Sequence, residues 1–487
     1  MPVLMHISDL HRSADEPVSN AELVAALERD LNRQSSEDPP ISRPDALIVS
    51  GDLVKGAQIS DPDPEGTINA QYRQAEEFLG ELTDLLFQGD RSQVVICPGN
   101  HDVNWHQARA SMELVPEENI PRDVYRALVE PASHLRWDWT ERALYRIVDM
   151  IAYENRMSSY WEFVRRFYRD ADILRLPNNS DEPLLVELFQ GRVLAAAFNS
   201  CSANDCFRRR AEIDPEALAR MHLDMHQAWE YDLRVAVWHH NTAGPPSADD
   251  YLHVEQVYAL IEYGFRLGLH GHQHRSELRL HELRLPGYGS LAVLSAGSLA
   301  AGHADLPRGT NRQYSVIEIA EDLTAARLHV REIETGAQYG PRRLNAFGGL
   351  SYSDITWQAA TSVVGTRVDN ARLNLSTIVN EAETAFNAED DDRVLTLLRP
   401  LIARLDAYGR RLLANAASRA RDWQTLVDDF SPPKSIEEIA LVVHAALQLD
   451  DFERARSTIR DAGIALGLPD PQRDEFLDQV AIREAIR

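Results

Sequence analysis

The sequence predicts an α/β domain followed by an all-α domain, and two observations indicate this order. In the first part of the chain, short apolar stretches typical of buried strands alternate with stretches in which apolar residues have helical spacing. After residue 366 no strand pattern remains, and helical spacing continues to the end of the sequence. A chain of 487 residues is also too long for one ordinary core, so we expect two or three domains.

The elements of the α/β part follow one another along the chain. Strands are expected at residues 3–8, 45–50, 93–97, 184–189, 192–198, 233–238, 265–269, 291–295, 314–319 and 326–333. Helices are expected at residues 21–31, 70–87, 215–231 and 254–263. Strands that are separated by amphipathic helices favour a parallel or mixed sheet with helices on its faces.

A long interruption separates the third expected strand from the fourth. Between residues 105 and 172, helical spacing dominates and aromatic residues crowd together. We interpret 105–172 as a helical insertion that forms a cap with its own aromatic core. Arginines alternate with the aromatic residues in this segment, and such a mixture can also bind bases and phosphates. A contact between the cap and a substrate therefore stays open.

The domain boundaries are predicted from composition. We expect the α/β domain at residues 1–345, because residues 340–349 are rich in Gly, Pro and Arg and are typical of a connecting segment. We expect a linker at residues 346–365 and the all-α domain at residues 366–487.

Three stretches of the all-α domain have similar sequences. Asp392, Trp423 and Phe452 occupy matching places in them, 31 and 29 residues apart. A period near 30 indicates a helix–turn–helix repeat array, and the stretches resemble degenerate tetratricopeptide units. An irregular helical bundle is the alternative. A repeat array would bind a protein partner or mediate self-association.

Composition limits the class of protein. The formal net charge of −26 opposes an extended, non-specific grip on nucleic acid. No apolar run approaches the roughly 18 residues that a membrane span needs, and the N-terminus lacks the features of a signal peptide. Three cysteines form no pairing framework, which favours a reducing compartment. We therefore expect a cytoplasmic protein with no membrane contact.

Five short polar segments lie at or just after predicted strand ends. Their polar residues are Asp9 and His11, Asp52, Asn100 with His101 and Asp102, His239 with His240, and His272 with His274. Functional groups of α/β sheets gather outside the carboxyl ends of the strands, so these segments are expected to meet at one edge. Carboxylates, an Asn carbonyl and neutral imidazoles suit borderline divalent metals such as Mn²⁺, Fe²⁺ or Zn²⁺.

These motifs, in this order, resemble those of the calcineurin-like metallophosphoesterase family: Asp-x-His, Gly-Asp, Gly-Asn-His-Asp, His and Gly-His-x-His. The resemblance covers residues 1–335, and every block is present. It implies a metallophosphoesterase fold, a four-layer α/β/β/α sandwich. It also implies that the protein hydrolyses phosphoester bonds at a centre of two divalent ions, for which we favour Mn²⁺ over Fe²⁺, Zn²⁺ or Ni²⁺.

The resemblance assigns a role to each motif residue. One ion would be held by Asp9, His11 and His274. The other ion would be held by Asn100, His239 and His272. Asp52 would bridge the two ions. His101 would not bind a metal but would face the phosphate, where it stabilises the transition state or protonates the leaving group. Asp102 would orient His101.

The contacts with the substrate are less defined by the sequence. Arg208, Arg209 and Arg210 follow a predicted strand and an Asn-Ser pair, and three arginines there could bind a phosphate. An exposed basic turn is the alternative interpretation. His240 stands beside a predicted metal ligand and could touch the substrate, orient the site or do neither.

The segment from His6 to His11 resembles bacterial cyclic-nucleotide phosphodiesterases of the family more than phosphoprotein phosphatases. We therefore expect a phosphodiesterase for a nucleotide-type substrate. The alternative is a metal-dependent nuclease that cuts DNA or RNA, acting as the effector of a bacterial complex that recruits it through the C-terminal helices. A third hypothesis is an adaptor, in which partner binding by the helical repeats regulates the phosphoesterase.

Overall fold

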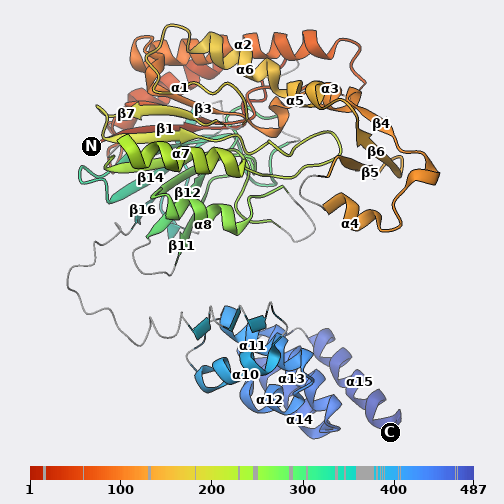
Figure 1. Ribbon diagram of the computed structural model, residues 1–487. Helices are drawn as coiled ribbons and strands as arrows, with labels where there is room; N and C mark the ends of the chain where they lie inside the picture. The colour runs from red at the N-terminus through yellow and green to blue at the C-terminus, as the bar shows by residue number, and fades with distance from the viewer. Residues whose placement is uncertain are drawn as a thin grey trace. The chain divides into compact units, whose positions relative to one another are not determined.

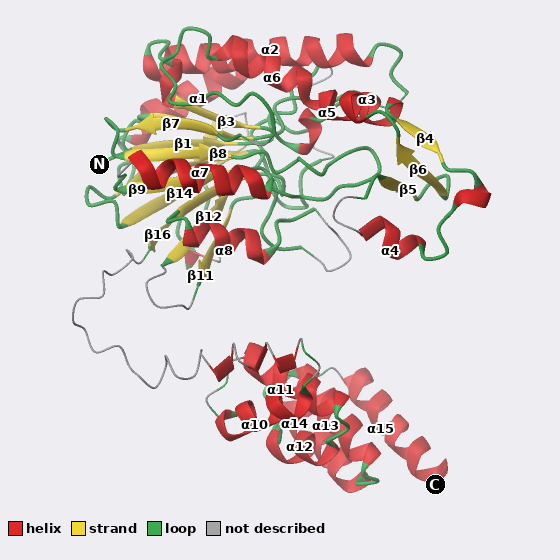
Figure 2. Ribbon diagram, viewed as in Figure 1, coloured by secondary structure: helices red, strands yellow, loops and turns green. Residues whose placement is uncertain are grey.

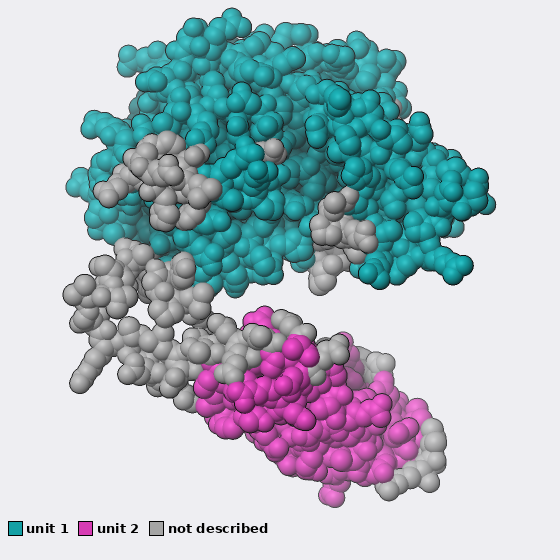
Figure 3. All heavy atoms as spheres, viewed as in Figure 1, with its two compact units in different colours: residues 1–362 teal, residues 363–487 magenta. Residues whose placement is uncertain are grey.

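The structure of the protein is a computed structural model. It describes residues 1–487 apart from 15–17, 59, 130–132, 181, 229–230, 245–249, 284–288, 303–304, 335–337, 345–346, 358–377, 380–381, 384, 387, 389, 404, 406, 467, 469 and 487. The chain forms two compact units, residues 1–362 and residues 363–487 (Figure 3). Among the described helices, none combines the length and apolar character that crossing a membrane requires.

The first sheet of the first unit is mixed and has the order β15-β14-β13-β1-β2-β3, with β16 paired to β14. Its strands are β1 (Val3–Ile7), β2 (Ala46–Ser50), β3 (Val94–Cys97), β13 (Gln313–Ile319), β14 (Ala325–Glu334), β15 (Gln338–Pro341) and β16 (Tyr352–Thr356). β1, β2 and β3 run parallel, and β13 is antiparallel to β1. The carboxyl ends of the three parallel strands therefore share one edge.

The second sheet has the order β11-β12-β10-β9-β8-β7. Its strands are β7 (Leu184–Leu188), β8 (Val193–Ala197), β9 (Leu233–Val237), β10 (Leu267–His270), β11 (Glu277–Glu282) and β12 (Ser290–Ser295). Its four central strands, β8, β9, β10 and β12, run parallel to one another, and the outer strands β7 and β11 are antiparallel to them. As in the first sheet, this arrangement collects the carboxyl ends of the central strands at one edge.

Helices cover the two sheets on opposite sides (Figures 1 and 2). The first sheet shares its core with α1 (Asn20–Gln34), α2 (Pro64–Phe87) and α6 (Ser158–Phe167). The second sheet shares a separate core with α7 (Pro215–Ala228) and α8 (Val254–Glu262).

Alternating side chains show how the second sheet lies between two cores. In β8, Val193, Ala195 and Ala197 belong to the core shared with the first sheet. Leu194 and Ala196 belong to the core under α7 and α8. Successive side chains of a strand point to opposite faces, so the layers run α/β/β/α as the resemblance implied.

A buried ion-pair network ties α1 to the first sheet. Arg331 on β14 and Asp30 on α1 are each 1% exposed, and their Nη2 and Oδ1 atoms are 2.7 Å apart. Arg331 also pairs with Glu37 at 2.6 Å, and the hydroxyl of Tyr314 donates to Asp30. A charge buried this completely is stable only while its partners remain, so this network fixes the position of α1.

The predicted helical insertion, residues 105–172, contains strands as well as helices. Its helices are α3 (Trp105–Ala110), α4 (Val124–Val129), α5 (Met150–Glu154) and α6. Between them lies a three-stranded antiparallel sheet of β4 (Met112–Leu114), β6 (Ala143–Ile147) and β5 (Leu135–Asp138). The all-helical prediction is wrong for these strands. A tight turn defines their hairpin: the Asp138 side chain accepts from the amides of Thr140 and Glu141, and Arg142 is left-handed with φ 54°.

The predicted end of the first domain at residue 345 and the linker at 346–365 also need correction. β15 and β16 both pair with β14, so the sheet continues to Thr356. The indole of Trp357 is buried and donates to the carbonyl of Leu323 at 2.8 Å. The long β14 would otherwise leave an open edge, and these apparently linker-like residues cover it. Residues 358–365 of the predicted linker lie outside the described residues.

The second unit is helical wherever it is described. Its helices include α10 (Asp391–Leu398), α11 (Ala407–Arg419), α12 (Trp423–Asp429), α13 (Ile436–Gln448), α14 (Phe452–Ala465) and α15 (Asp470–Ile486). The same turn precedes α10, α12 and α14. In each turn the side chain of an aspartate caps the helix, and the backbone amide of that aspartate donates a hydrogen bond to the carbonyl of an alanine five residues earlier. These aspartates are Asp390, Asp422 and Asp451.

We predict that Arg331→Ala lowers the free energy of unfolding by about 3–5 kcal/mol, because it leaves Asp30 buried without its main counter-charge. Arg327→Ala is the matched control, since Arg327 lies on the same strand but forms an exposed pair with Asp354. Its loss should be about 0–1 kcal/mol. Urea unfolding of both full-length variants measures the difference, and equal losses would contradict the structural role of the buried network.

Candidate metal centre

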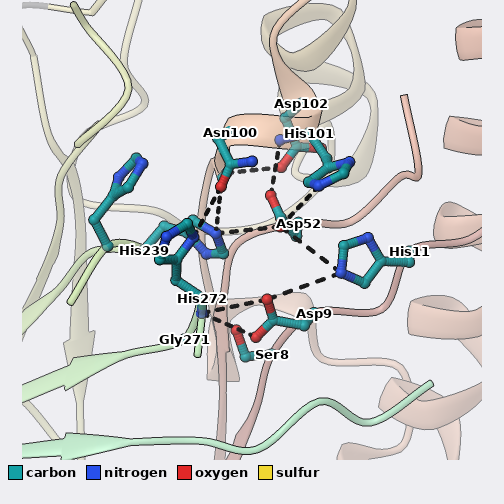
Figure 4. Close-up of polar contacts among 12 residues, drawn as sticks. Ser8, Asp9, His11, Asp52, Asn100, His101, Asp102, His239, Gly271 and His272 are labelled. Atoms are coloured by element: carbon teal, nitrogen blue, oxygen red, sulfur yellow. Dashed lines mark hydrogen bonds and ion pairs between the residues drawn. The ribbon is translucent and has the colours of Figure 1, made fainter. Parts of the chain in front are cut away.

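The predicted ligands meet at the joint edge of the two sheets (Figure 4). Asp9 and His11 follow β1, Asp52 follows β2 and Asn100 follows β3, all in the first sheet. The remaining ligands come from the second sheet, with His239 after β9 and the pair His272 and His274 after β10. Backbone bonds join neighbouring loops: Asp9 N donates to Gly51 O at 3.1 Å, and Gly271 N donates to His239 O at 3.0 Å.

One group of side chains gathers around Asp9. Its Oδ1 atom lies 3.2 Å from Nε2 of His274 and 3.9 Å from Nε2 of His11. The Nε2 atoms of His11 and His274 are themselves 3.2 Å apart. These three residues bring their ligand atoms close enough together to hold one metal ion.

A second group gathers around Asn100 and Asp52. The Oδ1 atom of Asn100 lies 3.1 Å from Nε2 of His239 and 3.0 Å from Nδ1 of His272. The Oδ2 atom of Asp52 lies 3.2 Å from the same Nε2 of His239 and 3.8 Å from Nε2 of His11. Asp52 therefore stands between the two groups, where a bridging ligand would lie.

The hydrogen bonds of the histidine rings show that the site suits cations. Nδ1 of His239 is 2.8 Å from the carbonyl of Ser50, and Nδ1 of His274 is 2.7 Å from the carbonyl of Asp305. A carbonyl only accepts, so each Nδ1 carries the proton and each neutral ring directs the Nε2 lone pair inward. There the lone pairs face carboxylate and amide oxygens, which also only accept. A cation between them removes this conflict, and the residues fit divalent metals.

The pKa values of two imidazoles also indicate that the site attracts positive charge. Burial acts to lower the pKa of His239, but Asp52 more than offsets it and raises the pKa to about 9. Burial and Asp9 act in the same opposing way on His274, whose pKa is also raised to about 9. Without a metal these rings attract protons to the places that metal ions would take.

The backbone at the site is strained. Left-handed φ angles occur at Asp9 (53°), His11 (44°), Asp52 (51°), His272 (74°) and His274 (53°). Such angles are uncommon outside glycine, and they persist only where the surrounding structure imposes them. At each of these positions the bend turns a ligand side chain toward the shared edge.

His101 and Asp102 are placed differently from each other. His101 is partly exposed (38%), and its Nε2 atom lies 4.0 Å from Oδ2 of Asp52. Its Nδ1 atom is 2.8 Å from the carbonyl of Lys55, and that carbonyl orients the ring. The prediction that Asp102 orients His101 is therefore wrong, because the Lys55 carbonyl has this role.

Asp102 instead supports the backbone of the site. Its Oδ2 atom accepts from the amides of Gly99 (2.8 Å) and Leu53 (3.3 Å), and its Oδ1 atom accepts from the Tyr72 hydroxyl. Burial, followed by the nearby Asp52, raises the pKa of Asp102 to about 7. Asp102 thus connects the loops after β2 and β3.

His240 is fully buried, which contradicts the predicted contact with substrate. Its Nδ1 atom lies 2.9 Å from Oγ of Ser200, and that oxygen also accepts from the amides of His239 (3.2 Å) and His240 (3.3 Å). His240 and Ser200 therefore support the loop that carries the ligand His239.

The structure separates the three neighbouring arginines. Arg210 forms an ion pair with Glu212 at 3.2 Å. Arg208 is half-buried, and burial followed by the charges of Arg136 and Arg210 lowers the pKa of its guanidinium. Arg209 is exposed, with its Cζ atom 6.0 Å from the ring centroid of Trp105. Only Arg209 of the three is presented on the surface beside an aromatic ring.

The loop that carries these arginines, residues 201–212, is fastened to the insertion. The Nε atom of Arg136 lies 2.5 Å from Asp205, and the Tyr153 hydroxyl donates to the same carboxylate at 2.8 Å. Arg156 donates to the carbonyl of Asn204 at 3.0 Å. Arg136, Tyr153 and Arg156 belong to the insertion, so the insertion supports this loop through both Asn204 and Asp205.

Several supporting groups were not predicted from the sequence. The carbonyls of Ser50, Lys55 and Asp305 orient rings, and a backbone carbonyl leaves no trace in residue type. Ser200 and Asp250 act through side chains, and the Oδ2 atom of Asp250 lies 3.6 Å from Nε2 of His272. For Ser200, the sequence signal was the Asn-Ser pair that follows β8.

The sequence matches the family model of calcineurin-like phosphoesterases over residues 2–276. That match, with the ligand set at the edge of an α/β/β/α sandwich, defines a metal-dependent hydrolase of phosphoester bonds. The chain therefore belongs to the calcineurin-like phosphoesterase family. No curated protein matches the chain.

The solved structures that the chain matches are distant from it in sequence. The GAP50 anchor of the inner membrane complex of Plasmodium is 9% identical, with a TM-score of 0.33, and the match covers 74% of this chain and 90% of that one. A 5′-nucleotidase from Candida albicans is 14% identical, with a TM-score of 0.34 and coverage of 69% and 52%. The calcineurin-like phosphoesterase YfkN from Bacillus subtilis is 10% identical, with a TM-score of 0.28 and coverage of 85% and 98%.

We predict that Gly99→Ala greatly weakens metal binding. A Cβ atom at position 99 would lie 2.1 Å from Oδ1 and 2.3 Å from the amide nitrogen of Asp52, so the bridging carboxylate would have to move. Gly80→Ala in α2 is the control, because its Cβ would meet nothing closer than 4.0 Å. Calorimetric titration with Mn²⁺ measures the affinity, and wild-type affinity in Gly99→Ala would contradict the close approach.

Proposed function

We propose that this phosphoesterase is a phosphodiesterase with a binuclear metal centre that acts on a nucleotide-type substrate. The observation that carries the proposal is the position of Asp52 between two complete donor groups, with the partly exposed His101 beside it. Asp9, His11 and His274 would hold one ion, and Asn100, His239 and His272 the other. Mn²⁺ is the ion we favour, because the donors are mixed oxygens and imidazoles.

Bound divalent ions would supply a water of lowered pKa as nucleophile and would offset charge on the phosphoryl oxygens. The residues of the chain contribute the remaining chemistry. Asp52 would be the ligand that the two ions share. The loops that carry the ligands are held by backbone bonds, so little reorganisation accompanies the reaction.

His101 is proposed as the proton donor to the leaving group. The Lys55 carbonyl accepts a hydrogen bond from Nδ1, so Nε2 is the nitrogen that can carry and release the transferred proton. The Nε2 atom of His101 lies 4.0 Å from Oδ2 of Asp52, beside both donor groups. The exposed face of the ring gives a leaving group access to it.

A nucleotide-type substrate is supported by the pairing of Arg209 with Trp105. Guanidinium and indole groups together can stack on a base and contact phosphate. Arg210 is engaged with Glu212 and Arg208 is half-buried, so Arg209 is the exposed arginine of the three in this loop. A small diester with a single negative charge suits this arrangement better than a long polyanion.

We also propose that the second unit is a helical repeat array that binds a protein partner or another copy of the chain. The aspartate-capped turn before α10, α12 and α14 supports a repeated construction. Salt bridges also recur between helices, with Arg419 bonded to Asp391 and Arg410 to Glu438.

The proposed activity is tested by turnover of the purified chain with Mn²⁺ and with chelator. The substrates are bis-p-nitrophenyl phosphate, a panel of cyclic nucleotides, and single- and double-stranded DNA. We expect Mn²⁺-dependent hydrolysis of the small diesters and no cleavage of DNA. Cleavage of DNA would instead support the nuclease alternative. Absence of turnover with both ions bound would oppose the activity and favour a chain that requires a partner.

We predict that His101→Ala lowers kcat by about 10²–10⁴-fold on a substrate with a poor leaving group, while both ions remain bound. The reduction should shrink when the leaving group is p-nitrophenolate, which needs no proton. Asp52→Asn is the comparison variant and should abolish turnover with every substrate, because the bridge is lost. If His101→Ala failed to bind metal, the role proposed for His101 would be wrong.

A further inference from the structure

His272 differs from the other ligands in how its ring is supported. Its Nδ1 atom lies 3.0 Å from Oδ1 of Asn100, on the side of the metal position. Its Nε2 atom points the other way, toward Oδ2 of Asp250 at 3.6 Å. His239 and His274 instead bond their outer nitrogens to backbone carbonyls.

The chemistry of the imidazole ring gives Asp250 a definite role. A neutral ring has one protonated nitrogen and one lone pair. If Nδ1 is to bind a metal beside Asn100, the proton must reside on Nε2, and the acceptor that faces Nε2 is the carboxylate of Asp250. A carboxylate in this position fixes the tautomer and makes the ring a better ligand.

Asp250 is placed there by the segment that follows it. Tyr251 pairs with Asn241 in an isolated bridge, and the amide of Leu252 donates to the carbonyl of Asn241 at 2.8 Å. Leu252 is fully buried. Asn241 itself stands two residues after His239, so the loops that carry Asp250 and a metal ligand are joined.

Asp250 lies outside the hydrophobic core, and its side chain is 40% exposed. Its replacement should therefore leave the fold intact.

We propose that Asp250 is a positioning residue for the second metal position, where it holds His272 in the tautomer that presents Nδ1 to the ion. The proposal rests on the ligand assignment given above for Asn100, His239 and His272.

The test is the affinity of the full-length chain for Mn²⁺, measured by calorimetric titration of the metal alone. Asp250→Ala removes the acceptor and should weaken one of two bound ions by about 10–100-fold, leaving the other unchanged. Asp250→Asn keeps an acceptor oxygen without the charge, and its affinity should lie between those of Asp250→Ala and the wild type. Glu255→Gln, an exposed charge change in the first turn of α8, is the matched control and should bind as the wild type does.

Either of two results would overturn the proposal. One is wild-type affinity for both ions in Asp250→Ala. The other is that each variant, Asp250→Ala and Asp250→Asn, binds its two ions with equally reduced affinity. The affinity measurement needs no substrate. Selective weakening of one ion in a protein that hydrolyses no diester would support the role of Asp250 and refute only the proposed activity.

Discussion

The site depends on the burial of one carboxylate, that of Asp52, at the meeting point of two sheets. The residue is 1% exposed, and it lies within 4 Å of imidazole nitrogens from both donor groups. A negative charge in such a place is tolerated only if positive charge is supplied nearby. The histidines around it can supply protons, but their fixed lone pairs suit metal ions better. The buried charge and the donor atoms around it are therefore both suited to a cation at this edge.

The two-sheet arrangement sets the distance between the two donor groups. Asp9, Asp52 and Asn100 come from the first sheet, and His239, His272 and His274 come from the second. Each donor group draws on both sheets, so the packing between the sheets fixes the geometry of both positions. The core between them is filled by aliphatic side chains such as Val193, Val235 and Leu267, which pack densely and resist displacement.

The fold brings together the side chains that the sequence predicted as ligands, because their chemistry is carried by residue type and order. Asp9, Asn100 and His274 each stand in a short motif directly after an apolar strand, and the parallel strands bring these motifs together. The supports around them were harder to predict. The carbonyls of Ser50 and Lys55 could belong to any residue, and Asp250 lies far from every motif in the sequence.

The errors in the fold have a similar origin. β16 was read as linker because its pairing partner, β14, lies about 25 residues away and only tertiary contact makes Tyr352–Thr356 a strand. The short strands of the insertion were hidden among aromatic residues that are compatible with helix and strand alike. The three arginines at 208–210 illustrate the remaining limit: residue type predicted a basic cluster, but only the fold shows that Arg210 is paired and Arg209 is presented.

The fastening of the 201–212 loop to the insertion has an evolutionary consequence. The positions of the ligands depend on the two sheets. The position of the 201–212 loop, which carries Arg209, depends on contacts with the insertion such as that of Arg136 with Asp205. A lineage could therefore exchange or remodel the insertion and acquire a new specificity while the hydrolytic centre stays as it is. This separation of the ligands from the substrate-contacting loop lets the reaction stay the same while the substrates change.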